Sequence, residues 1–219
     1  MKATKLAGLT LGVSLFAAAA PSAAYADVIT FNFEGSSLAS GLTTLTLTGG
    51  GLTATLTRPG SNFAIVDESF TGSGVPVSWG ARSLSPFDNS ASNTPFVLNF
   101  SQAITSLAID MGDFGADTDV LSIQLFSGLN GTGTLLGSSS PLTLPGGGGD
   151  FSFLTPSASG TGALSAVFIG GSTDFPNSVF YDNIRATFGA TTATPEPATL
   201  ALMGTGLIGI GLIRRKKRV

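Results

Sequence analysis

Leu52-Thr53-Ala54-Thr55-Leu56-Thr57 places an apolar side chain and a threonine at alternate positions. A similar alternation runs through Leu121-Ser122-Ile123-Gln124-Leu125-Phe126 and through Ile184-Arg185-Ala186-Thr187-Phe188. Because successive side chains of a β-strand point to opposite faces, a period of two predicts strands with one buried face and one solvated face. We therefore expect half-buried strands over 52–57, 121–126 and 184–188.

The middle of the chain contains further short apolar or β-branched segments, separated by Gly, Ser, Asn and Pro. They predict strands over 28–33, 42–48, 63–66, 96–100, 104–110, 151–154 and 164–169. Asn130-Gly131, between two such segments, is typical of a tight β-hairpin turn. About ten short strands in one domain predict an all-β fold, a two-layer antiparallel β-sandwich of the jelly-roll type.

The charges of the 219-residue chain are segregated. All four lysines and three of the six arginines lie near the termini, so the middle keeps three arginines against ten aspartates and two glutamates. Nucleic-acid binding depends on Lys and Arg that neutralise phosphates, so this acidic domain is not expected to bind nucleic acid. The chain also has no histidine and no cysteine, and the lack of the commonest general base favours a non-enzymatic protein.

The N-terminus has the pattern of a signal peptide. Lys2 and Lys5 precede a largely apolar run over 6–20, and Ala24-Tyr25-Ala26 offers small residues at the alternate positions that signal peptidase requires. The apolar run is short for a membrane anchor and no basic residues follow it. We expect a signal peptide over 1–26, cleaved after Ala26, and a β-sandwich ectodomain over 27–190.

The C-terminal segment 191–219 has three parts in order: Pro195-Glu196-Pro197, an uncharged stretch over 198–213, and a basic cluster of Arg214, Arg215, Lys216, Lys217 and Arg218. As a helix the uncharged stretch would be about 24 Å long, slightly short of a hydrocarbon core of about 30 Å. Snorkelling arginines and local thinning of the bilayer can close that gap. By the positive-inside rule, we expect one transmembrane helix over 198–213 with the acidic domain on the periplasmic side of the inner membrane.

This order of Pro-Glu-Pro, Gly-rich apolar stretch and terminal basic cluster resembles the PEP-CTERM sorting domain. The resemblance implies recognition by exosortase, a membrane-embedded cysteine protease of Gram-negative bacteria that make exopolysaccharide. It also implies processing near Pro195-Glu196-Pro197 and delivery of the ectodomain to the cell surface or extracellular matrix, in association with exopolysaccharide or biofilm. An ordinary anchor would need no Pro-Glu-Pro, and its glycines would weaken a helix by about 1 kcal/mol each relative to Ala.

Aspartates are concentrated in one segment. Asp110, Asp113, Asp117 and Asp119 fall within ten residues that include glycines, and Asp182 precedes the last strand. Hard oxygen ligands on a glycine-containing turn are what calcium selects, so these five residues are a candidate calcium site; no other cofactor is expected. Their spacing is not that of an EF-hand loop, and the alternative is a solvated turn in which aspartates cap their own backbone amides.

Trp79 is the single tryptophan, and it lies near Arg82 and Asp88 in the sequence. An aromatic ring beside polar groups can stack on a sugar, so Trp79 is a candidate ligand platform; the alternative is a tryptophan buried in the core. A carbohydrate-binding module, with or without calcium, is therefore the alternative to a purely structural surface protein. A secreted hydrolase that uses paired carboxylates is a further alternative, but the local sequence selects no such pair.

Overall fold

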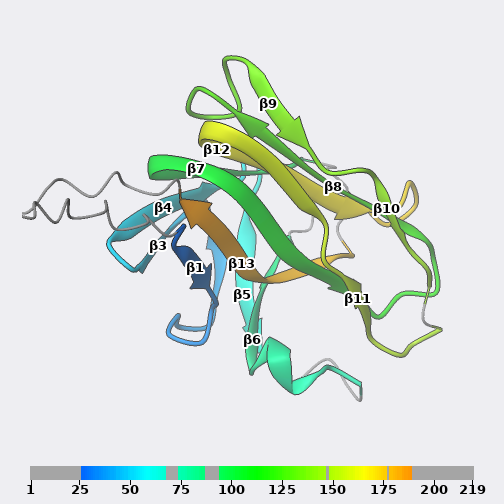
Figure 1. The fold of residues 1–219 in the computed structure, drawn as a ribbon. Coiled ribbons are helices and arrows are strands. Elements are labelled where there is room, and N and C mark those ends of the chain that lie inside the picture. The colour runs from blue at the N-terminus through cyan, green and yellow to red at the C-terminus, as the bar shows by residue number, and fades with distance from the viewer. Residues whose placement is uncertain (1–25, 68–73, 87–93, 147, 177, 189–219) are drawn as a thin grey trace, which may run out of the picture. The chain divides into compact units, whose positions relative to one another are not determined.

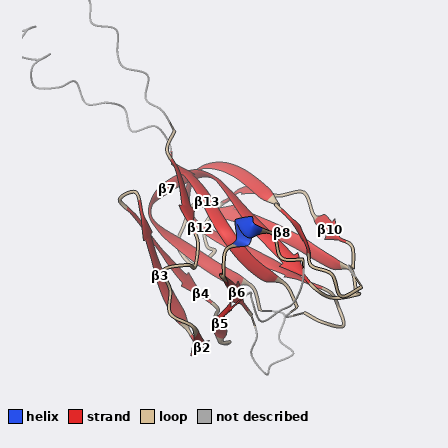
Figure 2. Cartoon of the chain, turned by 90° about the horizontal axis from the view of Figure 1, so that it is seen from below, coloured by secondary structure: helices blue, strands red, loops and turns tan. Residues whose placement is uncertain are grey.

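The computed structural model describes residues 26–67, 74–86, 94–146, 148–176 and 178–188, and these residues fold as strands with one short helical turn (Figures 1 and 2). The strands are β1 (Val28–Phe31), β2 (Ala39–Leu42), β3 (Thr44–Gly49), β4 (Leu52–Thr57), β5 (Phe63–Asp67), β6 (Arg82–Ser85), β7 (Phe96–Asp113), β8 (Asp119–Phe126), β9 (Leu135–Ser138), β10 (Leu142–Leu144), β11 (Ser152–Leu154), β12 (Ser157–Gly171) and β13 (Phe180–Phe188). The turn is the 3₁₀ helix η2 (Val77–Trp79). The predicted all-β fold is confirmed.

All strand pairs are antiparallel, and β7 joins them into one 13-stranded sheet. β12 lies along one side of β7 (Figure 1), and β11 continues along that side near the end of β7. On the other side, β4 pairs with residues 97–100 of β7, whereas β13 pairs with residues 104–112. The sheet therefore divides at β7 into a branch through β4 to β3 and a branch through β13, β6 and β5 to β2, and the core lies between them.

Aromatic side chains from β5, β7, β12 and β13 meet in this core. Tyr181 of β13 packs edge-to-face on Phe96 of β7 and Phe168 of β12, with ring centroids 5.2 Å apart in each pair. Phe63 of β5 also packs edge-to-face on Phe96, with ring centroids 5.7 Å apart. Phe63 and Phe96 come from strands that are not neighbours in the sheet, as do Tyr181 and Phe168, so burial of these rings packs separate parts of the sheet against each other.

Two β-bulges decide which side chains of β7 and β13 point inward. Pairing of β7 with β13 shifts by one residue around Thr105, and the inward residues of β7 change from Phe96, Leu98, Phe100 and Ile104 to Leu107, Ile109 and Met111. A second shift falls between Asp182 and Arg185, where Asn183 has a left-handed φ of 45°. An extra residue in one strand re-aims the side chains that follow it. The bulge in β7 thus leaves Asp110 on the outer face and Asp113 on the inner face.

The strand predictions for 52–57 and 121–126 are confirmed by β4 and β8. The segments 96–100 and 104–110, predicted as two strands, are one continuous strand, β7, because 101–103 stay extended between them. The predicted turn forms at Asn130-Gly131: both residues have positive φ, 57° and 68°, and Thr132 N–H donates to Leu129 O. These are the features of a type I′ turn, and the turn connects the paired strands β8 and β9.

Tyr25–Ala190 forms one compact unit. Residues 1–25 of the predicted signal peptide, with the cleavage residue Ala24, lie outside the described residues, as do the sorting motif, the helix over 198–213 and the basic cluster; Ala26 is the first described residue and is exposed. Within the part of the chain that the structure describes, no helix has the length and apolarity required to cross a membrane.

Candidate functional site

The five aspartates predicted to form one calcium site fall into two groups on opposite faces of β7. Asp110 points outward, and register places Asp182 of β13 directly opposite it. Asp113, at the end of β7, and Asp119, at the start of β8, have the inward orientation of Met111 and Leu121. Asp117 lies in the turn that joins the two strands. Strand geometry therefore separates residues that are only three positions apart in the sequence.

Asp110 is engaged by hydrogen-bond donors from several segments. Arg185 donates to its two carboxylate oxygens at 2.5 and 3.2 Å, and the Thr155 hydroxyl donates to Oδ1 at 2.7 Å. Asn183 Nδ2 donates to Asp110 Oδ2 at 3.1 Å and to Ser78 O at 2.8 Å. The left-handed bulge at Asn183 aims its amide at both acceptors. Because each oxygen of Asp110 accepts two hydrogen bonds, we interpret this network (Asp110, Thr155, Asn183 and Arg185) as a structural tie between β13, β7 and the η2 turn.

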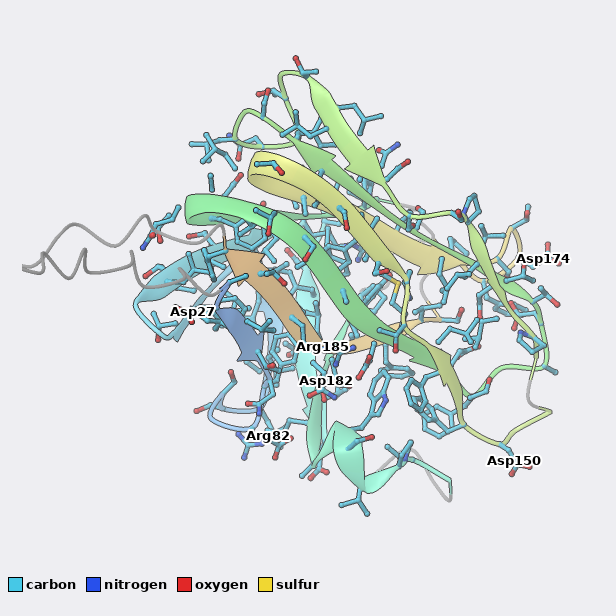
Figure 3. All side chains as sticks on the ribbon, in the orientation of Figure 1. Asp27, Arg82, Asp150, Asp174, Asp182 and Arg185 are labelled. Atoms are coloured by element: carbon cyan, nitrogen blue, oxygen red, sulfur yellow. The ribbon has the colours of Figure 1, made fainter. Side chains whose placement is uncertain are left out.

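Figure 3 shows Asp182 and Arg185 together near the middle of the domain, whereas Asp150 and Asp174 lie toward another end. Asp182 is 1% exposed. Because register pairs it with Asp110, its side chain lies on the same face of the sheet as Asp110 and not with the inward carboxylates at the end of β7.

The inner-face group consists of Asp113, Asp117 and Asp119. Gly115 N–H donates to Asp113 Oδ2 at 2.8 Å, and the Ser178 hydroxyl donates to Asp119 Oδ1 at 3.1 Å. The second oxygen of Asp119 and Oδ2 of Asp117 are both buried, and neither has a hydrogen-bond partner. A Cβ at Gly115 would lie 2.3 Å from Asp113 Oδ2 and 2.5 Å from Asp117 Oδ1, so the carboxylates crowd around a position that only glycine can occupy without displacing them.

Burial and mutual repulsion make these carboxyl groups weaker acids. Burial is the main cause that raises the pKa of Asp119 to about 7, and the negative charges of Asp113 and Asp117 add to it; the Ser178 hydroxyl opposes the shift. Burial also raises the pKa of Asp113, while the backbone amides of Gly115 and Phe114 lower it. A hydrogen bond between the two carboxyls lowers the pKa of Asp113 and contributes to the raised pKa of Asp119. The pair therefore needs a proton or another positive charge between its oxygens.

An open hollow of about 530 Å³ lies beside this group, lined by Gly115, Ala116, Asp117, Phe175 and Ser178. The Phe175 side chain is 61% exposed at its rim. Ser178 contributes both to the hollow and to the hydrogen bond with Asp119. Phe175 was not among the predicted site residues; it lies between Asp174 and Pro176, two residue types that are common in turns.

Trp79 is not the ligand platform that the sequence suggested. Its side chain is 0% exposed, and it packs edge-to-face against Phe151 and Phe153 at centroid distances of 4.8 and 5.7 Å. The η2 turn directs the indole inward, where these rings cover it. The alternative interpretation, a core tryptophan, is the one that the structure supports.

Among the described residues, no group of three acidic side chains is already arranged to hold a metal ion. The predicted set of Asp110, Asp113, Asp117, Asp119 and Asp182 is therefore not one preformed centre. Any cation at the inner-face group would have fewer than three carboxylates as direct ligands at first, with backbone oxygens and water as the others.

Comparison with known proteins identifies the C-terminal tail. Residues 193–217 match the model of the PEP-CTERM protein-sorting motif, which confirms the resemblance seen in the sequence. The motif indicates an exported protein that is sorted to the cell envelope or surface. No curated protein matches this chain.

Several solved structures are distantly similar to the domain. The K2 cleaved adhesin domain of Lys-gingipain is 16% identical, with a TM-score of 0.49, over 74% of this chain and 98% of that one. The CBM22-2 xylan-binding domain of Paenibacillus barcinonensis Xyn10C is 14% identical, with a TM-score of 0.39, over 74% of this chain and 99% of its own. A family 29 carbohydrate-binding module is 12% identical, with a TM-score of 0.34, over 80% and 99%. At such low identities and TM-scores, these similarities assign no ligand to this chain.

Proposed function

We propose that this chain is an exported, non-enzymatic surface protein whose β-domain is delivered to the cell surface or extracellular matrix by exosortase processing of its tail. The observation that carries this proposal is the match of residues 193–217 to the PEP-CTERM protein-sorting motif. The chain has no histidine and no cysteine, which removes the most common catalytic base and thiol nucleophile.

The chemistry of the tail suits such a role. Pro195 and Pro197 exclude a regular helix and favour an extended backbone, so a protease can reach the segment around Glu196. The basic cluster 214–218 would hold the following apolar segment in the membrane from the cytoplasmic side. In this arrangement the acidic domain lies on the periplasmic side until the tail is cut.

The test replaces Pro195-Glu196-Pro197 by three alanines in a host that encodes an exosortase. We expect signal cleavage and export to continue, while the unshortened protein accumulates in the inner membrane. The matched control replaces Thr191, Thr192 and Thr194 by alanine, which changes the same number of neighbouring residues and keeps Pro-Glu-Pro. If the Pro-Glu-Pro variant is shortened and reaches the surface as the unmodified chain does, the segment is a plain anchor.

A second candidate function is binding of exopolysaccharide at the hollow beside Phe175. The exposed ring can stack on a sugar face, and the Ser178 hydroxyl and Asp117 carboxylate offer hydrogen-bonding groups alongside it. Retention of the protein on its own host's exopolysaccharide, compared with that of Phe175→Ala, tests this candidate.

A further inference from the structure

Among the described residues, the inner-face carboxylates have no cationic side chain as partner. Arg185 is paired with Asp110, and Arg58 donates to the carbonyl oxygens of Thr94, Asn62 and Pro86. In the described parts of the chain, no arginine forms an ion pair with Asp113, Asp117 or Asp119. Asp119 is 1% exposed, so water does not solvate its charge as it would at the surface. A buried carboxylate without a positive partner is strongly unfavourable.

A single proton satisfies this group only in part. A proton between Asp113 and Asp119 would remove one charge and supply one hydrogen bond. It would leave Oδ2 of Asp117 buried without a partner. A divalent cation, by contrast, contacts several oxygens at once and offsets two negative charges.

We propose that a divalent cation of the calcium type binds between the carboxylates of Asp113 and Asp119, where β7 ends and β8 begins. Asp117 adds negative charge from the intervening turn and moves toward the cation when it binds. Backbone carbonyls of the turn and water from the hollow beside Ser178 complete the coordination. The site is independent of how the tail is sorted.

The ligand chemistry favours calcium over magnesium. Calcium accepts six to eight oxygen ligands in flexible geometry, whereas magnesium demands a near-ideal octahedron and keeps much of its water. A turn with two inward carboxylates and a glycine between them can adjust to the flexible coordination geometry of calcium. Gly115 is part of the site, because a side chain there would enter the space between Asp113 and Asp117.

The binding test follows thermal unfolding of the full chain, purified in mild detergent. Extracellular calcium modules have a Kd of about 10⁻⁴ M or weaker, so about 10 mM CaCl2 is an adequate concentration. We expect Tm to rise by roughly 5 °C relative to EDTA, because a ligand that binds only the folded state stabilises it. Magnesium chloride at the same concentration should give a clearly smaller rise, and an equal rise would identify an effect of ionic strength and overturn the site.

The decisive variant is Asp119→Asn, whose effect should change sign with calcium. In EDTA at pH 8 we expect it to raise Tm, because it removes a buried charge that is repelled by its neighbours. In calcium it should lower Tm below that of the unmodified chain, with the calcium response reduced to about 1 °C or less. The control is Asp174→Asn, which removes one charge from an exposed residue and should respond to calcium as the unmodified chain does.

Asp113→Asn and Gly115→Ala are the second set of variants, in case Asp119→Asn does not fold. Each should abolish the calcium response. No calcium response in the unmodified chain, or a response that all three variants retain, would overturn the proposal. Stability that changes with pH but not with calcium would show that a proton neutralises the pair, and would also overturn it.

Discussion

The phenolic oxygen of Tyr181 in β13 accepts a hydrogen bond of 2.8 Å from the backbone N–H of Gly170 in β12. The two residues belong to strands on opposite sides of β7, and the ring of Tyr181 lies against Phe96 and Phe168. Tyr181 thus supplies to the core both a large apolar ring and the acceptor for a buried backbone donor.

Tyr181→Phe should lower the free energy of unfolding by about 1–2 kcal/mol. The ring packing is retained, but the N–H of Gly170 loses its acceptor in a dry environment. Urea unfolding of the full chain in detergent measures the change. Thr143→Val, which removes an exposed hydroxyl, is the control and should change stability by less than about 0.5 kcal/mol. An equal effect of both changes would mean that the buried hydrogen bond contributes nothing specific.

Burial raises the pKa of Tyr181 well above its usual range. Its ordinary value is about 10, so the unfolded chain loses this proton near pH 10 while the folded chain keeps it. Stability should therefore fall as the pH rises above about 10. The chain has one other tyrosine, Tyr25, so tyrosinate absorbance of a Tyr25→Phe variant follows Tyr181 alone. Ionisation of the folded chain near pH 10 would contradict the burial of this residue.

The inner-face aspartates should make stability depend on pH in EDTA. The pKa of Asp119 is raised to about 7, whereas the unfolded value is about 3.9. Between these two pKa values Asp119 is ionised in the unfolded chain but largely protonated in the folded chain. The stability that Asp119 contributes is therefore complete below about pH 4 and is lost as the pH rises to about 7. Denaturant unfolding at pH 4.5 and pH 8 should show that Asp119→Asn removes this decrease. If the decrease is the same in Asp174→Asn and Asp119→Asn, its source lies elsewhere.

Arg185→Met should destabilise the domain by about 2 kcal/mol. It leaves the buried carboxylate of Asp110 without its ion-pair partner; loss of a fully buried partner costs about 3–5 kcal/mol, but solvent reaches part of the Arg185 side chain. The calcium response of this variant should be unchanged, because Asp110 belongs to the structural network and not to the inner-face group. Loss of the calcium response in Arg185→Met would mean that the structural network and the inner-face group form one site.

Trp79 and Phe175 should respond in opposite ways to substitution. Trp79→Ala should cost about 3–5 kcal/mol, because it empties a packed site against Phe151 and Phe153. Phe175→Ala should change stability by less than about 0.5 kcal/mol and weaken retention on exopolysaccharide, because its ring is exposed beside the hollow. Thermal unfolding and polysaccharide pull-down, run on both variants, separate the core residue from the exposed one.

Local patterns were sufficient to predict much of the fold. Alternation over 52–57 and 121–126 predicted β4 and β8, and Asn130-Gly131 predicted the turn between β8 and β9, because strand periodicity and positive φ depend on residues that are adjacent in the chain. The sorting motif is also a linear pattern, which is why its residues were identified without a fold.

The partners of each side chain were decided only by the tertiary structure. Asp110 and Asp113 looked like members of one site, but β7 stays extended to Asp113, so residues three positions apart in it lie on opposite faces. Arg185, 75 residues away in the chain, donates hydrogen bonds to Asp110, and the Ser178 hydroxyl donates to Asp119 from a separate loop. Trp79 likewise became a core residue because Phe151 and Phe153 cover it. Sequence spacing specifies backbone periodicity, whereas burial and hydrogen-bond partners come from strands that meet only when the sheet closes on its core.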